Sequence, residues 1–289
     1  MSSRLTAAFD ALREANRPGL VTYTAAGDPD LSRSAEVLRA LDRAGADVLE
    51  VGVPFSDPMA DGPVIQRATE RAIAAGSNLS ATLDIIGRVR SDVKAPIVLF
   101  SYANPLLRMG TAEVARRAAA AGVDGVLALD LPIEEAGEFQ RTMDAARLDT
   151  IFLLSPTTTD ERIQKAARLG RGFLYGISRL GVTGARDQVA AGAEAMVRRI
   201  RAFTSLPIAL GFGISRPEHV AEVGGFADAA VVGSALVALI EKESGSPALV
   251  DRVEEYVRSL RAACRPRGTR SVGAGVSRPD PPEGERFRG

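Results

Sequence analysis

Three carboxylates gather where an apolar segment runs into a rigid loop. Glu50 stands inside the apolar run 48–53, and Asp57 and Asp61 follow in a loop stiffened by two prolines. Burying a carboxylate among aliphatic side chains is unfavourable unless the group is paired or neutral. Enzymes built from alternating strands and helices place acid–base groups at strand ends in this way, although such carboxylates also serve structure. The pattern therefore indicates either general acid–base catalysis by Glu50 or a structural ion pair.

Three glycine-bearing segments lie late in the chain, each after an apolar run. They are Gly-Val-Thr-Gly at 181–184, Gly-Phe-Gly at 211–213 and Gly-Ser-Ala at 233–235. Glycines let backbone N–H groups approach an oxyanion closely, and a helix beginning near Ser234 would add its positive dipole end. One glycine alone is more often a turn or a helix cap. Three in loops that a barrel would place side by side favour a phosphate site.

The segment 178–187 (Ser-Arg-Leu-Gly-Val-Thr-Gly-Ala-Arg-Asp) is long enough to fold over a ligand in that site. Its glycines suit a lid that closes on substrate. Its composition suits an ordinary surface loop equally well, and both interpretations stay open.

The single histidine and the single cysteine restrict the chemistry. With only His219 and Cys264 in the chain, a zinc site of the usual nitrogen and sulfur ligands is disfavoured. A Ser-His-Asp or Cys-His relay is disfavoured too, because His219 lies in Arg-Pro-Glu-His, which reads as the first turn of a helix. We expect His219 to be structural or solvent-facing, and we predict no metal. Catalysis must then use carboxylates, hydroxyls, backbone amides and cations.

Charge and hydropathy limit the partners. The 289 residues carry 36 basic and 36 acidic side chains, which argues against binding nucleic acid or a membrane surface through bulk electrostatics. One cysteine suits a reducing compartment. The first residues lack an apolar signal core, and no run approaches the roughly 20 apolar residues of a spanning helix. We therefore expect a cytoplasmic protein.

Short apolar runs alternate with helical patterns along most of the chain. We predict strands at 20–24, 48–53, 97–102, 125–129, 150–154, 172–177, 207–211 and 229–232. Eight strands alternating with helices over about 250 residues is the pattern of a (β/α)₈ barrel. An open doubly wound sheet is the alternative, but no Gly-x-Gly-x-x-Gly follows the first strand, and we favour the barrel.

Two additions to a plain barrel are expected. Leu5, Phe9 and Leu12 are spaced as on an extra N-terminal helix, and 80–90 reads as a helical insertion before the third strand. We predict one barrel domain over 1–264. The segment 265–289 is rich in Arg, Pro and Gly and is predicted to be a disordered tail without a catalytic part.

Taken together, these segments resemble the α subunit of tryptophan synthase. The most specific are Leu-Glu-Val-Gly-Val-Pro-Phe-Ser-Asp-Pro-Met-Ala-Asp-Gly (49–62) and Ser-Arg-Leu-Gly-Val-Thr-Gly-Ala-Arg (178–186). Gly-Asp-Pro (27–29), Tyr-Ala-Asn-Pro-Leu (102–106), Asp-Leu-Pro-Ile-Glu-Glu (130–135), Gly-Phe-Gly-Ile-Ser (211–215) and Gly-Ser-Ala (233–235) follow in the family's order and spacing. The resemblance covers about residues 3 to 262.

The resemblance implies a (β/α)₈ lyase, of the carbon–carbon/carbon–oxygen class, acting in tryptophan biosynthesis. Its reaction is the retro-aldol cleavage of indole-3-glycerol phosphate to indole and glyceraldehyde 3-phosphate. By resemblance, Glu50 gives a proton to indole C3 and accepts one from the side-chain hydroxyl. Its apolar setting should raise its pKa. Asp61 corresponds to the carboxylate that binds the indole N–H, and Tyr175 to a tyrosine near the catalytic glutamate.

The remaining site residues are also carried over from the resemblance. Tyr23, Tyr102 and Phe212 match residues around the indole, and Thr183 matches a lid residue that orders Asp61. The phosphate cradle is implied to be Gly184, Gly213, Gly233 and Ser234. The family needs no metal or organic cofactor in this chain.

A partner is implied as well. Family members pass indole to a pyridoxal-phosphate β subunit in an α2β2 complex, and the pyridoxal phosphate belongs to that subunit. By resemblance, the docking face uses the segments at 57–58, 104–105 and 130–132. Three alternatives remain: a free-standing lyase that releases indole, another phosphate-binding barrel enzyme, and a catalytically silent regulatory subunit. Intact Glu50 and Asp61, at the family's spacing, speak against the last two.

Overall fold

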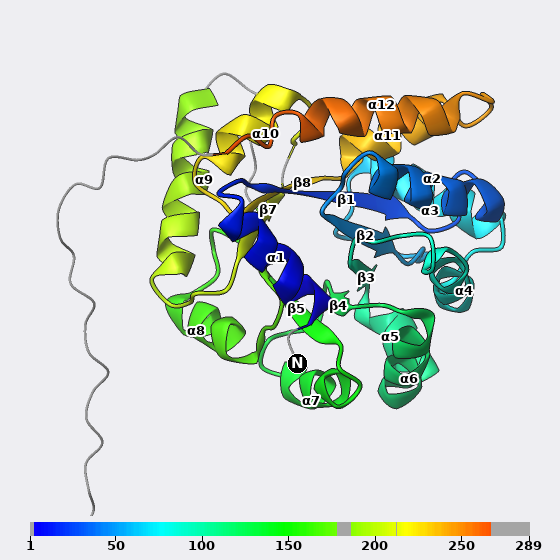
Figure 1. The fold of residues 1–289 in the computed structure, drawn as a ribbon. Coiled ribbons are helices and arrows are strands. Elements are labelled where there is room, and N and C mark those ends of the chain that lie inside the picture. Colours follow the sequence, from blue (N-terminus) through cyan, green and yellow to red (C-terminus); the bar gives the residue numbers. More distant parts are fainter. Residues whose placement is uncertain (1–2, 178–185, 212, 267–289) are drawn as a thin grey trace, which may run out of the picture.

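The protein folds as a closed barrel of eight parallel strands surrounded by helices (Figure 1). The computed structural model describes residues 3–177, 186–211 and 213–266. The strands are β1 (Gly19–Ala25), β2 (Val48–Gly52), β3 (Ile97–Ser101), β4 (Gly125–Ala128), β5 (Asp149–Leu154), β6 (Leu174–Ile177), β7 (Ile208–Gly211) and β8 (Ala229–Val232). Each strand pairs with the next in the chain, and β8 pairs with β1. All eight predicted strands are present, with small shifts at their ends, so the barrel is confirmed.

The helices follow the alternation that the sequence predicts. They are α1 (Arg4–Glu14), α2 (Leu31–Arg43), α3 (Pro63–Ala74), α4 (Leu79–Val89), α5 (Ala103–Met109), α6 (Thr111–Ala121), α7 (Ala136–Ala145), α8 (Asp160–Leu169), α9 (Arg186–Arg201), α10 (Pro217–Gly224), α11 (Ser234–Lys242) and α12 (Leu249–Arg261). Two helices rather than one lie between β2 and β3, as the predicted insertion requires. Another pair, α5 and α6, lies between β3 and β4. In the part of the chain that the structure describes, no helix is long and apolar enough to cross a membrane.

Two apolar cores hold the barrel together. The larger one fills the space between the strands and the outer helices, with Leu38, Ile86 and Val253 among its members. The smaller one fills the barrel interior with side chains such as Val98 of β3, Leu127 of β4 and Phe173, which precedes β6. The interior is therefore packed with side chains, as in other barrels of this kind, and leaves no pore.

Helix α1 closes the end of the barrel at which the strands begin. Leu5, Phe9 and Leu12 of α1 are buried in the interior core, and the Phe9 and Phe173 rings lie 5.3 Å apart. In Figure 1 this helix (dark blue) crosses in front of the strands. The predicted N-terminal helix thus acts as a plug at the N-terminal face.

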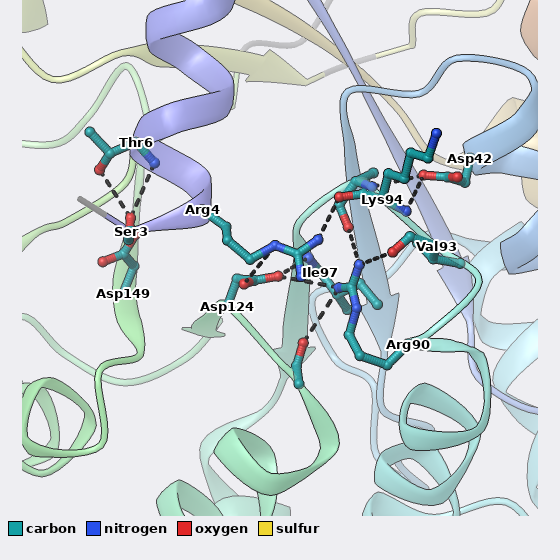
Figure 2. A network of polar contacts seen from close by, with 12 residues as sticks. Ser3, Arg4, Thr6, Asp42, Arg90, Val93, Lys94, Ile97, Asp124 and Asp149 are labelled. Carbon is teal, nitrogen blue, oxygen red and sulfur yellow. Dashed lines mark hydrogen bonds and ion pairs between the residues drawn. The ribbon is translucent and has the colours of Figure 1, made fainter. Parts of the chain in front are cut away.

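Polar groups at the same end are paired with one another (Figure 2). The Asp149 carboxylate accepts a hydrogen bond of 2.5 Å from Ser3 Oγ at the start of α1. The Asp124 carboxylate accepts the Ile97 backbone N–H at 2.8 Å and lies 3.4 Å from the Arg90 guanidinium. These contacts hold α1 and the starts of the strands together. This end of the barrel therefore has a structural role, and the opposite end is available for function.

Candidate active site

A large pocket opens at the carboxyl ends of the strands. Its volume is about 760 Å³. The strands contribute the aromatic side chains of Tyr23, Phe100 and Tyr175 and a ring of aliphatic ones. Residues 60–65, at and before the start of α3, form one side, and Gly233 and Ser234, at the start of α11, form another. Active sites of (β/α)₈ enzymes lie at this face.

Two glycines make room for the pocket's tyrosines. A Cβ atom on Gly52 would lie 2.2 Å from the Tyr23 hydroxyl, and one on Gly211 would lie 2.5 Å from the Tyr175 hydroxyl. Neither distance is possible between real atoms, so each tyrosine lies directly over a strand position that has no side chain. The Tyr23 ring also packs edge-on against Phe100, with centroids 5.3 Å apart. The glycines thus fix where the aromatic wall lies.

Glu50 is buried in the barrel interior beside this wall. Its side chain belongs to β2, with Tyr23 of β1 and Val98 of β3 as its strand neighbours, and only 1% of the residue is exposed. Among the described residues, neither carboxyl oxygen has a hydrogen-bond partner. Burial raises the pKa of this carboxyl to about 8. A glutamate with that pKa holds a proton near neutral pH and can donate it.

Glu50 also affects the pKa of two tyrosines in the pocket wall. Burial raises the pKa of Tyr175 well above the usual value for a phenol, and the nearby Glu50 raises it further. Glu50 adds to the raised pKa of Tyr23 as well, after burial and the Asp61 carboxylate. Tyr23 and Tyr175 line the pocket, whereas the buried Glu50 is not among the lining residues. The structure therefore brings Glu50 and Tyr175 together, as the sequence predicts.

Asp61 lies on the pocket wall in the loop that follows β2. Its carboxylate accepts a 3.1 Å hydrogen bond from the Tyr102 hydroxyl, which in turn accepts the Ala60 N–H at 3.0 Å. Burial raises the pKa of Asp61, and the Tyr102 hydrogen bond partly offsets this increase. The Gln66 side chain also donates to the Asp61 backbone carbonyl. Tyr102 is buried behind Asp61 and is not one of the lining residues, so its contact is with Asp61.

Three of the residues predicted to bind phosphate also lie on the pocket wall. Gly213, Gly233 and Ser234 line it, and α11 begins at Ser234 as predicted. Gly233 precedes the helix without a side-chain cap, so no side chain occupies the first N–H groups of α11. A Cβ atom on Gly233 would come no closer than 3.6 Å to Tyr23. The predicted residues Thr183, Gly184 and Phe212, and most of the predicted lid, lie outside the described residues.

Two features of the pocket were not found from the sequence. Phe100 is an inward-facing residue at the end of β3, paired in register with Gly52. The alternation along β3 could have indicated it. His219 and Glu222 of α10 line the pocket rim, where His219 Nδ1 accepts the Ser215 N–H at 3.3 Å. His219 is partly exposed and its hydrogen bond with Ser215 fits the expected structural role, although the residue also borders the pocket.

The described residues contain no group of three or more His, Cys, Asp or Glu side chains placed to hold a metal ion. The polar groups on the pocket wall include the Asp61 carboxylate, tyrosine hydroxyls and backbone amides, and the Glu50 carboxyl is buried next to the lining tyrosines. Such a donor set suits proton transfer and anion binding.

A buried carboxyl without a partner beside the pocket and an uncapped helix start on its wall are groups that a (β/α)₈ enzyme can use for proton transfer and anion binding. Comparison with known proteins defines the family. Residues 9–265 match the family model described as tryptophan synthase alpha chain. The tryptophan synthase alpha chain of Solibacter usitatus is 47% identical over 259 residues, covering 90% of this chain and 97% of the relative. That of Geobacter sulfurreducens is 49% identical over 261 residues, covering 90% and 98%.

Solved structures agree with this assignment. A structure of Mycobacterium tuberculosis tryptophan synthase has a TM-score of 0.83 at 37% identity, covering 92% of this chain and 99% of that one. Tryptophan synthase subunit alpha from Legionella pneumophila has a TM-score of 0.85 at 35% identity, covering 91% and 99%. The chain belongs to the tryptophan synthase alpha chain family. The predicted fold and lyase class are confirmed.

Proposed function

We propose that the protein cleaves indole-3-glycerol phosphate to indole and glyceraldehyde 3-phosphate, with Glu50 as its acid and base. The single observation that carries this proposal is the buried Glu50 carboxyl, which has no hydrogen-bond partner among the described residues and whose pKa is raised to about 8. A structural carboxylate at this position would have a cation or amide partner. A carboxyl that must first donate a proton and then take one back works best without a fixed hydrogen-bond partner.

Glu50 acts twice in the proposed reaction. The protonated carboxyl first gives its proton to indole C3, which places a positive charge on the ring. The carboxylate then takes the proton of the adjacent side-chain hydroxyl while the carbon–carbon bond breaks and its electrons return to the ring. Indole and the aldehyde are released, and Glu50 is protonated again. Because Glu50 is not among the residues that line the pocket, its side chain must turn toward the pocket to reach C3.

Asp61 and the aromatic wall are proposed to hold the indole. The Asp61 carboxylate would accept the indole N–H and stabilise the charge that develops after protonation of C3. Tyr102 would keep this carboxylate in place through its 3.1 Å hydrogen bond. Tyr23, Phe100 and Tyr175 supply flat apolar surface for the ring.

The phosphate is proposed to bind at Gly213, Gly233 and Ser234. The start of α11 offers free N–H groups and the positive end of the helix dipole, and glycine at 233 lets the anion approach the backbone. Thr183, Gly184 and Phe212 remain part of this proposal by resemblance. No metal or organic cofactor is needed in this chain, and we assign pyridoxal phosphate to the partner alone.

We also propose that the protein works in an α2β2 complex with a tryptophan synthase β subunit. Met59, in the loop after β2, is 85% exposed, and Leu107 of α5 is 62% exposed. Their segments meet at Tyr102, which precedes α5 and contacts Ala60, and Asp130 accepts the Ala103 N–H. This apolar face coincides with the segments that the resemblance assigns to docking. The buried, unpaired Cys264 fits the reducing cytoplasm in which we place this complex.

Indole release from indole-3-glycerol phosphate tests the proposal. The purified chain should release indole slowly alone, and at least about tenfold faster with a β subunit, as expected for coupled sites. Fast release without a partner would indicate the free-standing lyase. Release under neither condition would overturn the lyase assignment.

A further inference from the structure

Helices α3 and α11 both begin at the pocket and run away from it side by side. Residues 62–65 at the start of α3 and residues 233–234 at the start of α11 line the pocket. Farther along, Ala68 of α3 and Val237 of α11 are buried in one apolar cluster with Tyr23 and Ala25 of β1. The two helices therefore carry opposite ends of the substrate site on a shared support.

An ionic bridge joins the two helices beyond this cluster. The Arg71 guanidinium of α3 donates to both oxygens of Asp28, at 2.8 and 3.1 Å, and to Glu241 of α11 at 2.7 Å. Asp28 follows β1, and its side chain is only 1% exposed. Arg67, which is half exposed, also contacts Glu241. One arginine thus ties the end of β1, α3 and α11 together.

The bridge lies at matched distances from the pocket on both helices. Arg71 comes eight residues after Pro63, and Glu241 comes seven after Ser234. With a rise of about 1.5 Å per residue, these separations are roughly 12 Å and 10 Å. A shift of one helix along the other would have to break the contacts of Arg71 with Glu241 or Asp28.

We propose that the Asp28–Arg71–Glu241 bridge is a spacer that sets the distance between the indole end and the phosphate end of the site. Arg71 and Glu241 are then positioning residues, which act through α3 on Asp61 and through α11 on Gly233 and Ser234. This inference rests on the proposed function, which assigns those two ends. A ligand that occupies one end is insensitive to the spacing. A ligand that spans both ends depends on it.

Binding of whole and partial ligands to the full chain tests the spacer. The probes are indole, glycerol 3-phosphate and an uncleavable indole-3-alkyl phosphate that spans both ends. In Glu241→Gln, the Asp28–Arg71 pair survives, so no buried charge loses its partner. We expect this variant to bind each fragment within twofold of the wild type and the spanning ligand about tenfold more weakly. Arg71→Gln should weaken the spanning ligand in the same way but also lower thermal stability, because it leaves the buried Asp28 without its cation, and Arg71→Lys should recover part of both losses.

Two matched controls separate spacing from stability. Arg67→Gln removes a contact to Glu241 but leaves the bridge intact, and it should bind all three probes normally. Glu254→Gln on α12 removes a carboxylate that also contacts two arginines, Arg43 of α2 and Arg258 of α12 itself, and neither helix lines the pocket. It should lower thermal stability about as much as Glu241→Gln and leave all three affinities unchanged.

The outcomes are distinguishable. Normal binding of the spanning ligand by folded Glu241→Gln would overturn the spacer. Equal weakening of fragments and spanning ligand would assign the bridge a purely structural role and also overturn it. A wild-type chain that binds neither fragment would overturn the proposed function and the spacer together.

Discussion

The aspartates where the strands begin and Glu50 of β2 are held in opposite ways, although the buried Asp28 after β1 is paired with Arg71. Where the strands begin, Asp47, Asp124, Asp149 and Asp228 each have a hydrogen-bond partner. Where they end, Glu50 has none among the described residues. The same kind of group is thus held in place at one end and left free to exchange a proton at the other. In (β/α)₈ barrels, residues at the N-terminal face stabilise the fold, whereas residues at the C-terminal face carry out catalysis.

The partners at the N-terminal face follow a repeated plan. Asp47, Asp124 and Asp228 stand just before β2, β4 and β8, and each accepts the backbone N–H of a residue in a neighbouring strand. Arginines then approach the same carboxylates, as Arg17 does at Asp47. These aspartates accept hydrogen bonds from backbone N–H groups that would otherwise have no partner at the starts of the strands.

Burial raises the pKa of both Asp124 and Glu50, but partners offset it only at Asp124. Burial raises the pKa of Asp124, while the Ile97 N–H and two arginines lower it. For Glu50, burial is the cause and nothing opposes it. The difference between the two carboxyls therefore lies in the partners.

The largest expected effect is the loss of cleavage in Glu50→Gln. The amide has the size of the carboxyl but cannot donate a proton to carbon, so turnover should fall by about 10²–10⁴-fold. Indole release by the variant, with circular dichroism to confirm folding, measures it. Near-normal turnover would show that Glu50 is not the acid and base of the reaction.

Asp61→Asn should lose less activity. Asparagine still accepts the indole N–H but carries no charge to stabilise the protonated ring, so we expect a loss of about 10²-fold with a residual rate. Steady-state kinetics should place most of this loss in kcat, because the charge develops after substrate binds. A change confined to KM would show that Asp61 contributes only to binding.

The matching change at the other end is Asp47→Ala. It leaves the Arg17 guanidinium and the Leu20 N–H without their acceptor, so unfolding free energy should fall by about 2–3 kcal/mol. Urea denaturation measures the loss, and indole release per folded molecule should stay at the wild-type level. If Asp47→Ala kept its stability and lost its activity, Asp47 would serve catalysis, and the assignment of roles to the two faces would be contradicted.

Tyr102→Phe should have the smallest effect. It removes one hydrogen bond to Asp61, a contribution of about 1 kcal/mol, which corresponds to a roughly fivefold loss of turnover. Because that hydrogen bond lowers the pKa of Asp61, the acidic limb of the pH–rate profile should move to higher pH. An unshifted profile would indicate that Tyr102 does not act through Asp61.

The sequence predicts the elements and the position of Glu50 because both leave local signals. Short apolar runs announce buried parallel strands, and a glutamate in such a run stands out. The start of α11 was predicted from Gly233 and Ser234 for the same reason.

Contacts between distant segments leave no such signal. The pairing of Arg71 with Asp28 and Glu241 joins residues 43 and 170 positions apart. The sequence around His219 does not indicate that α10 borders the pocket. Phe100 resembled any other core residue until the barrel register placed it at a strand end beside Gly52.

Titration of Glu50 itself tests the central claim most directly. Carboxyl carbon NMR of the ¹³C-glutamate-labelled chain, with Glu50→Gln to assign the signal, follows its ionisation. The folded-state pKa is raised above the ordinary value of 4.5, so the carboxyl should stay protonated through neutral pH and titrate near pH 8. Ionisation near pH 4.5 would show that Glu50 is an ordinary carboxylate at neutral pH, and the acid–base role derived from its burial would be contradicted.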